Sequence, residues 1–289
     1  MKIIILGAKG NLGVQLVKAL SEDHVVLAWD RDDLDVLETA LLTERIREAA
    51  PQVIINAVAY NAVDKCEDAA ELPMALRLNS DLPGILADLS LEQKALLVHY
   101  STDYVFNGTA EKQLFYEDET PNPVNKYGVS KFQGERELLK RGADGLDFLL
   151  IRTSKLFGPR GESPQAKPSF FDIMLDLAQN KDELTVVNEE LSCFTYTPDL
   201  AAATKRLVES AAVSGIYHLV NEGPVTWFDA ARELFKLKKK TVALRPVRSE
   251  NLLRAARRPK YSVLMNTKIK RLRSWQEALK EYLRESSAG

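Results

Sequence analysis

The sequence predicts an α/β fold, with a doubly wound parallel sheet followed by a smaller α/β region. Three observations support this prediction. Short, almost continuously apolar runs alternate with helical patterns through the first half of the chain, which is typical of parallel strands covered on both faces. A glycine-rich turn follows the first apolar run directly, and the regular alternation ends near residue 153.

The elements are expected in a defined order along the chain. Apolar runs predict strands at 2–6, 24–29, 52–57, 95–100 and 146–152. Apolar residues spaced three and four apart predict helices at 11–21, 39–50, 72–89 and 127–141. After residue 153 shorter elements mix, with helices expected at 170–179, 199–210, 227–235 and 274–285 and strands at 185–187 and 215–219. We therefore expect two domains, 1–152 and 153–289, with segments of the second re-entering the first.

Composition argues against several classes of protein. The chain has 289 residues, of which 45% are hydrophobic and 28% charged, as is ordinary for a globular protein. Its 39 basic and 41 acidic side chains give a formal charge of −2, so no nucleic-acid partner is expected. Two cysteines and three separated histidines form no metal-binding motif, and we expect no metal site. Since no apolar run approaches about 18 residues, we expect a cytoplasmic protein without a membrane span.

The turn after the first strand carries Gly7, Gly10 and Gly13, and a helix follows it. Glycine permits close approach of the backbone to a pyrophosphate, and the helix N-terminus offers free N–H groups. Asp30 ends the second strand, where a carboxylate would bind an adenosine ribose. Residues 1–152 are thus interpreted as a dinucleotide-binding domain; the alternative is a tight turn without cofactor. Asp30 favours NADH, but Arg31 would offset a 2′-phosphate, so the cofactor is NADH or NADPH.

Tyr127 and Lys131 are four residues apart on a predicted helix, so their side chains share one face. The simplest interpretation of such a pair is a solvated helix face. However, the helix follows the fourth strand and the polar residues after it, including Thr102, and ligands collect at the carboxyl ends of parallel strands. There Tyr127 would give a proton to a carbonyl that is being reduced, and Thr102 would hold its oxygen. The Lys131 ammonium, together with the positive ring of the oxidised cofactor, would lower the pKa of Tyr127 towards neutrality.

The motifs GAKGNLG (7–13), STDYVFNG (101–108) and YGVSK (127–131) resemble those of the extended short-chain dehydrogenase/reductases, and more closely the dTDP-4-dehydrorhamnose reductase family. Similar segments occur over nearly the whole chain, at 55–67, 151–158, 215–229 and 257–268. The resemblance implies a Rossmann-type sheet, a C-terminal substrate-binding domain and a homodimer. It also implies NADH- or NADPH-dependent reduction of the 4-keto group of a nucleoside-diphosphate sugar.

The resemblance further assigns roles to residues of this chain. It implies that Thr102, Tyr127 and Lys131 are catalytic and that Asp103 and Tyr104 lie on the substrate side. The residues expected to line the cofactor, besides the three glycines and Arg31, are Asn11, Leu12, Asp30, Ala57, Val58, Ala59, Tyr127 and Lys131.

Several substrate-side positions depart from the family pattern, whereas the catalytic trio is intact. Lys155 stands where tryptophan is common, Asn61 where threonine is common, and Gln15 where some members have a magnesium-binding glutamate. The segment 188–195 also differs. Lys155 and Asn61 remain candidate substrate-binding residues. Because Lys155 replaces stacking area by a cation, we hypothesise a more anionic sugar.

Residues 236–273 contain 14 lysines and arginines and a single acid, Glu250. Without interleaved aromatic residues, this stretch favours a diphosphate-binding wall over a nucleic-acid patch, and Arg258 is the expected phosphate contact. Most of the other basic side chains are expected on a solvated surface. Asp64, Glu67 and Asp68 form an acidic cluster. We interpret them as acids at the start of a helix, where the helix dipole favours negative charge, rather than as a catalytic carboxylate pair.

Two other functions stay open at this point. The fold also serves nucleotide-sugar epimerases and dehydratases, although Asp103 and Tyr104 do not obviously supply the extra acid–base pair that such enzymes often need. A non-catalytic, cofactor-binding regulatory subunit is the second alternative, since fold alone does not fix function. The intact trio argues against it, and the altered substrate side keeps it open.

Overall fold

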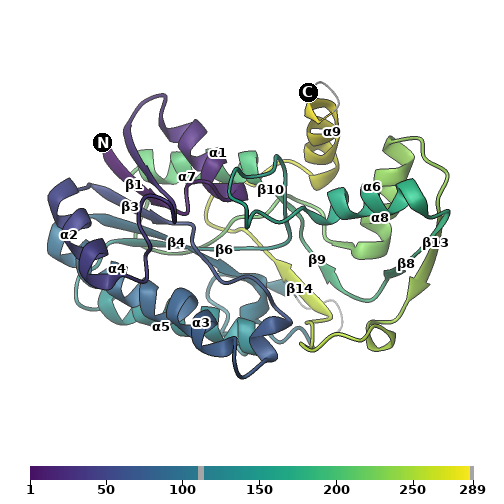
Figure 1. Cartoon of the computed structure of the whole chain (residues 1–289), viewed down its shortest axis with the longest axis horizontal. Coiled ribbons are helices and arrows are strands. Elements are labelled where there is room, and N and C mark those ends of the chain that lie inside the picture. The colour runs from purple at the N-terminus through teal and green to yellow at the C-terminus, as the bar shows by residue number, and fades with distance from the viewer. Residues whose placement is uncertain (110–113, 287–289) are drawn as a thin grey trace.

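A six-stranded parallel sheet organises the larger lobe of the molecule, in the order β2-β1-β3-β4-β6-β11 (Figure 1). The computed structural model describes residues 1–109 and 114–286. The strands of the sheet are β1 (Lys2–Leu6), β2 (Val25–Trp29), β3 (Val53–Asn56), β4 (Leu96–Thr102), β6 (Phe148–Thr153) and β11 (Gly215–His218). Because the chain continues first to one side of β1 and then to the other, the carboxyl end of β1 lies at a topological switch point, where such sheets bind ligands.

Alternation along β1 explains why helices cover both faces of this sheet. Ile3 and Ile5 belong to one buried cluster, and Ile4 and Leu6 belong to another on the opposite face. The first cluster is completed by helices α1 (Asn11–Leu20) and α7 (Thr197–Glu209). The second is completed by helices α2 (Thr39–Ala49), α4 (Leu82–Gln93) and α5 (Lys126–Gly142). Both helix layers are visible on either side of the sheet in Figure 1, which confirms the predicted fold class.

One predicted helix, 72–89, is interrupted. It consists of α3 (Leu72–Leu76), the π-helical turn η2 (Arg77–Asp81) and α4. Pro83 has no N–H with which to bond the carbonyl of Asn79 in a regular helix. Gly134 of α5 approaches that carbonyl so closely that a Cβ there would lie 2.1 Å from the oxygen. Single π-turns of this kind are frequent at functional sites.

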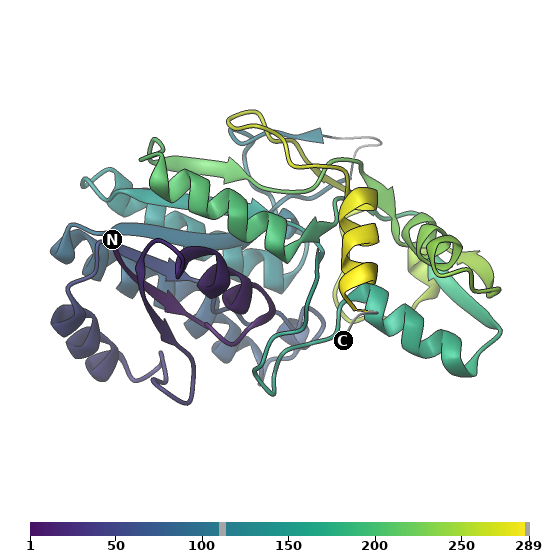
Figure 2. The same cartoon turned by 90° about the horizontal axis from the view of Figure 1, so that it is seen from above.

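The smaller lobe has an aromatic core between helices and a two-stranded parallel sheet. The sheet pairs β8 (Glu183–Val187) with β13 (Ala243–Val247). The helices are α6 (Phe170–Asn180), α8 (Trp227–Leu237) and α9 (Trp275–Glu285). Its core is built mainly from aromatic side chains, including Phe157, Phe171, Phe194, Tyr196 and Trp275. Figure 2 shows α9 between the two lobes.

Short strands and turns connect the lobes. β7 (Leu156–Phe157) pairs with β10 (Thr195–Tyr196). A four-stranded sheet joins distant segments and consists of β12 (Val225–Thr226), β9 (Leu191–Ser192), β14 (Tyr261–Leu264) and β5 (Leu114–Phe115). The remaining elements are 3₁₀ turns, η1 (Lys65–Glu67), η3 (Asp103–Val105) and η4 (Ser249–Asn251). Within the described ranges 1–109 and 114–286, no helix is both long and apolar enough to cross a bilayer.

Candidate active site

The glycine-rich turn lies between the carboxyl end of β1 and the start of α1. Gly7 has a φ of 77°, a left-handed conformation that glycine adopts without strain. A Cβ on Gly13 would lie 2.0 Å from the Gly7 carbonyl oxygen, so only glycine lets the helix pack this closely on the turn. The N-cap of α1 is Gly10, which has no side chain with which to cap the first N–H groups of the helix. The free N–H groups of the first helical turn therefore fit the pyrophosphate of a dinucleotide.

The segment after β3 forms the other side of this crevice. Ala57 donates its N–H to the Leu6 carbonyl, and a Cβ on Gly7 would lie 3.2 Å from the backbone of Ala57 and Val58. Ala59, next in sequence, is exposed. The structure thus brings the predicted segment 57–59 beside the glycine-rich turn.

Asp30 and Arg31 lie on the β2 side of the turn. The Asp30 carboxylate accepts the backbone N–H of Lys9 at 2.9 Å and that of Arg31 at 2.9 Å. Asp30 therefore also fixes the shape of the turn, a role that its spacing in the sequence did not reveal. The Arg31 side chain is exposed, where it has access to a ribose substituent.

Two predicted cofactor residues have other side-chain roles. Asn11 accepts the N–H of Gly161 at 2.8 Å and donates to the Lys167 carbonyl at 2.8 Å, so it holds the loop 159–168 against the turn. The side chain of Leu12 is buried in the core between α1 and the sheet. Only the backbone of Leu12, and not its side chain, is placed to face a cofactor.

Thr102, Tyr127 and Lys131 come together at the carboxyl edge of the sheet. Thr102 ends β4, and its hydroxyl donates to Asp103 at 3.2 Å and accepts the N–H of Tyr104 at 3.2 Å. Tyr127 and Lys131 lie one turn apart on α5, whose N-cap is Asn125. The Tyr127 and Tyr104 rings meet edge to face with centroids 6.0 Å apart.

Ionisation in the trio differs from the expectation in one respect. Burial raises the pKa of Tyr127 above its ordinary value, and this outweighs the lowering effect of its hydrogen bond with Thr102. Lys131 by itself does not bring the pKa of Tyr127 towards neutrality in this arrangement. Burial lowers the pKa of Lys131 to about 8, while Glu135 acts in the raising direction. At neutral pH the phenol is protonated, which is the form that a proton donor needs.

Lys131 is held by the strand beneath it. Its ammonium donates to the Tyr100 carbonyl at 2.7 Å and lies 3.3 Å from His99 Nε2. Burial holds the pKa of His99 well below its usual range, so the imidazole is neutral. The other ring nitrogen of His99 lies 3.1 Å from the Asn56 amide nitrogen. His99 is thus a buried polar partner of Lys131, where its place in an apolar strand had indicated only a core residue.

Asn79 borders the site through Ser130, whose hydroxyl donates to the Tyr127 carbonyl at 2.8 Å, and it was not among the residues predicted from the sequence. Its amide donates to the Ser130 hydroxyl at 3.0 Å and to the Tyr60 carbonyl at 2.9 Å, and its oxygen accepts the Tyr60 N–H at 2.9 Å. Asn79 thus ties the π-turn to both α5 and the segment after β3. A polar residue four positions before Pro83, inside an apolar helical pattern, is the signal that could have located it.

The substrate-side candidates separate into buried and exposed groups. Asp103 is 2% exposed and accepts the Ser262 hydroxyl at 2.6 Å. Burial raises the pKa of Asp103, against opposing hydrogen bonds and the charge of Lys155. Asn61 is exposed beyond the end of β3.

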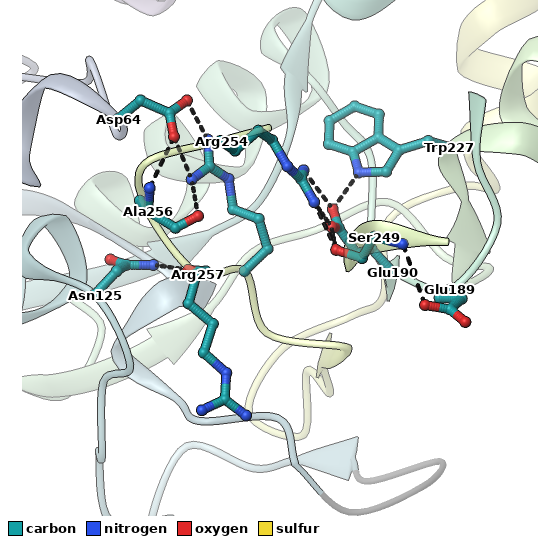
Figure 3. A network of polar contacts seen from close by, with 10 residues as sticks. Asp64, Asn125, Glu189, Glu190, Trp227, Ser249, Arg254, Ala256 and Arg257 are labelled. Carbon is teal, nitrogen blue, oxygen red and sulfur yellow. Dashed lines mark hydrogen bonds and ion pairs between the residues drawn. The ribbon is translucent and has the colours of Figure 1, made fainter. Parts of the chain in front are cut away.

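Arg258 is engaged in an ion pair that the sequence did not predict. Its guanidinium contacts Asp64 at 2.7 Å and 3.0 Å and donates to the Ala256 carbonyl. Asp64 and Ala256 are labelled in Figure 3. The interpretation of Asp64 as only a helix-start acid is therefore incomplete. A phosphate contact for Arg258 stays a prediction, and it would have to share the guanidinium with Asp64.

Acids elsewhere in the chain offset much of the basic stretch 236–273. Arg254 pairs with Glu190, which also accepts the Trp227 indole N–H at 2.9 Å and the Ser249 hydroxyl at 2.5 Å (Figure 3). Further ion pairs of this stretch are Arg245–Glu183, Arg248–Glu189, Arg271–Glu222 and Arg273–Asp199. At least seven of the 14 basic side chains of this stretch thus pair with an acid, so the stretch is less of a free cationic wall than the sequence predicted.

The whole chain matches one protein family. The model of the RmlD substrate binding domain matches residues 1–288. The spore coat polysaccharide biosynthesis protein SpsK of Bacillus subtilis is 34% identical, covering 99% of this chain and 98% of the relative. The dTDP-4-dehydrorhamnose reductase of Escherichia coli is 32% identical, covering 99% and 98%.

Solved structures agree with this assignment. A dTDP-4-dehydrorhamnose reductase of Bacillus anthracis in complex with NADP superposes with a TM-score of 0.89 at 31% identity, covering 98% of this chain and 99% of the other. A UDP-glucose 4-epimerase of Thermus thermophilus in complex with NAD has a TM-score of 0.80 at 18% identity, covering all of both chains, and shares the fold alone. The chain belongs to the RmlD family of dTDP-4-dehydrorhamnose reductases, within the extended short-chain dehydrogenase/reductases.

Proposed function

We propose that this protein reduces the 4-keto group of a nucleoside-diphosphate sugar with NADPH or NADH. The reaction most like it is the conversion of dTDP-4-dehydro-L-rhamnose to dTDP-L-rhamnose. The observation that carries the proposal is the convergence of Thr102, Tyr127 and Lys131 at the edge of the sheet that also presents the glycine-rich turn. Relatives named for this reaction over nearly the full length of the chain support it.

The residues of the site have distinct tasks in such a reduction. A reduced nicotinamide, when bound, supplies the hydride. Tyr127 gives its phenolic proton to the carbonyl oxygen as negative charge develops there, an effect worth about 10²–10⁴-fold in rate. Thr102 donates a hydrogen bond to the same oxygen. The Lys131 ammonium, fixed by Tyr100 and His99, stabilises the phenolate that remains.

Oxidation of NADPH and of NADH in the presence of dTDP-4-dehydro-L-rhamnose tests the proposal directly. Tyr127→Phe should reduce kcat by about 10²-fold or more, because the proton donor is lost. Tyr116→Phe is a matched control, since Tyr116 is 40% exposed outside the site, and it should leave kcat unchanged. Oxidation that persists in Tyr127→Phe would contradict the assigned proton donor.

Absence of cofactor oxidation would favour one of the two alternative functions. If the wild-type protein binds the cofactor but oxidises none with any 4-keto nucleotide sugar, the proposal is wrong and a cofactor-binding regulatory role replaces it. If a nucleotide sugar is instead epimerised without net oxidation of cofactor, the chemistry of the epimerases replaces it.

Cytoplasmic location and a homodimer complete the proposal. Cys66 and Cys193 are both unpaired thiols, as is usual in a reducing compartment. The dimer is supported by the family resemblance, and light scattering at several concentrations tests it through the measured mass. A mass equal to that of one chain at all concentrations would contradict it.

A further inference from the structure

Lys155 places a buried amino group without a hydrogen-bond acceptor at the edge of the site. It follows β6, and within residues 1–109 and 114–286 its inaccessible Nζ has no hydrogen-bond partner. Nζ lies 3.6 Å from the centroid of the Trp227 ring and 5.2 Å from that of Phe194. A cation–π contact attracts the charge but leaves the N–H donors of the ammonium unused.

The backbone conformation of Lys155 and the burial of its ammonium are both unfavourable. Its φ of 38° lies in the left-handed region, which a non-glycine residue adopts only at a cost. Burial lowers the pKa of Lys155 to about 7, because removal from water penalises the ammonium form. Backbone strain and poorly paired buried charge cluster at active sites and ligand clamps. Together they indicate that Lys155 has a ligand to bind.

The acidic side chains that face Lys155 already have other donors. Glu190 accepts hydrogen bonds from three side chains, those of Trp227, Ser249 and Arg254. Asp103 accepts hydrogen bonds from Thr102 and Ser262. Burial raises the pKa of the neighbouring Cys193 thiol to about 12, so that group is uncharged. Asp103 and Glu190 thus attract the Lys155 ammonium without using its hydrogens.

The charges around Lys155 balance without a ligand anion. Arg254 offsets Glu190, and Lys155 offsets Asp103. A carboxylate on the substrate would add a negative charge beside Asp103, whereas a hydroxyl oxygen would accept a hydrogen bond without adding charge. An uncharged oxygen therefore suits this group better than the anionic sugar that the sequence suggested.

Lys155 also lies close to the reacting centre. Thr102 of β4 pairs with Thr153 of β6, and paired strands are about 4.8 Å apart. Lys155 follows two residues later, and its charge interacts with Asp103, the neighbour of Thr102. A ketone held by Thr102 and Tyr127 therefore has other substituents of its ring within reach of a lysine side chain.

We propose that Lys155 is a specificity-determining residue whose ammonium donates a hydrogen bond to a hydroxyl group on the sugar ring close to the ketone. In the absence of a sugar the Lys155 ammonium lies against the aromatic face of Trp227, and it turns from this ring to the hydroxyl when the sugar binds. The site then selects sugars that carry this hydroxyl over deoxy sugars that lack it. The inference rests on the proposed function and names the substrate feature that the site recognises.

Binding of four nucleotide sugars to the protein with saturating NADP⁺, measured by calorimetry, tests this inference. The probes are dTDP-glucose, its 3-deoxy and 6-deoxy analogues, and dTDP-glucuronate. The 3-deoxy analogue should bind the wild type about 10-fold or more weakly than dTDP-glucose, since a hydrogen bond to a charged donor is lost. The 6-deoxy analogue should bind like dTDP-glucose, because the hydroxyl that it lacks is not on the ring and is also absent from the 4-keto sugar of the proposed reaction. In Lys155→Met the weaker binding of the 3-deoxy analogue should disappear, and dTDP alone should bind as before. dTDP-glucuronate should bind no more tightly than dTDP-glucose.

Lys239→Met is the matched control, because Lys239 also has a left-handed φ, of 51°, but is exposed at the end of α8. It should preserve the full discrimination. If Lys155→Met folds poorly, Lys155→Gln keeps a neutral donor and should show an intermediate difference. Equal affinity of the wild type for all four sugars, no binding of any of them, or equal weakening of all by Lys155→Met would overturn the inference. Turnover of a 4-keto sugar is measured separately, so failure of the reductase proposal would be distinguishable.

Discussion

Replacement of Glu135 by glutamine perturbs the interior of the larger lobe and the site together. Glu135 is completely buried and accepts two hydrogen bonds from Arg152, at 2.7 Å and 3.0 Å, while Arg152 is 1% exposed. Removing one partner of such a pair leaves a buried charge that is poorly compensated, at a cost of about 3–5 kcal/mol. Since glutamine keeps one carbonyl oxygen, we expect the lower end, about 3 kcal/mol.

Thermal and urea unfolding measure this cost. For a chain of this size, about 3 kcal/mol corresponds to a fall in Tm of roughly 6–12 °C. Glu137→Gln is the matched control, because Glu137 lies on the same helix but pairs with Arg141 at the surface. Exposed pairs contribute about 0–1 kcal/mol. Equal effects of the two substitutions would refute the assignment of a buried, mutually dependent pair.

Glu135→Gln should also change the pH dependence of kcat/KM. Glu135 acts to raise the pKa of Lys131, which burial has lowered to about 8. The ammonium is present below that pKa and lost above it, so kcat/KM should fall as pH rises through about 8. Glu135→Gln should move this basic limb to lower pH. An unchanged pH profile would show that the charge of Lys131 does not control turnover.

Three further predictions follow from the geometry. Asp30→Asn removes a charge that would repel a 2′-phosphate, so the ratio of NADPH to NADH affinity should rise several-fold in fluorescence titrations; a constant ratio would contradict its placement at the ribose. Gly13→Ala should abolish cofactor binding, because the Cβ would lie 2.0 Å from the Gly7 oxygen, and near wild-type affinity would show that the turn adapts. Lys155→Met should stabilise the protein most below pH 7, by about 2–4 kcal/mol, because the folded state resists protonation there. That gain should shrink as the pH rises from 7 to 10.5, because in that range folding of the wild type releases the proton of the unfolded lysine, and this release becomes easier at higher pH. A gain independent of pH in urea titrations would contradict the buried ammonium.

The parallel sheet could be predicted because its strands are short apolar runs with local boundaries. The continuous apolar run Ile3–Leu6 of β1 is a property of the sequence itself, and all four of its residues are buried between the two helix layers. The glycine turn and the Tyr127–Lys131 spacing are likewise local. Each places its residues in the site without reference to distant parts of the chain.

Long-range contacts could not be predicted from such local patterns. The ion pair of Arg258 with Asp64 joins residues 194 positions apart, and β5 pairs with β14 through only two residues of each strand. The π-turn at Asn79 arises because Pro83 lacks a donor and Gly134 permits close contact, a combination that periodicity does not encode. The left-handed backbone and Trp227 contact of Lys155 also required the folded structure.

Transfer of deuterium from NADPH deuterated at both C4 positions to dTDP-4-dehydro-L-rhamnose shows directly whether this site reduces the 4-keto group. The sugar product is examined by NMR after a single turnover, with Tyr127→Phe in parallel. We expect deuterium on C4 of the product for the wild type, and little product for Tyr127→Phe. Label at another carbon, or no label in any sugar product, would contradict reduction of the 4-keto group by this site.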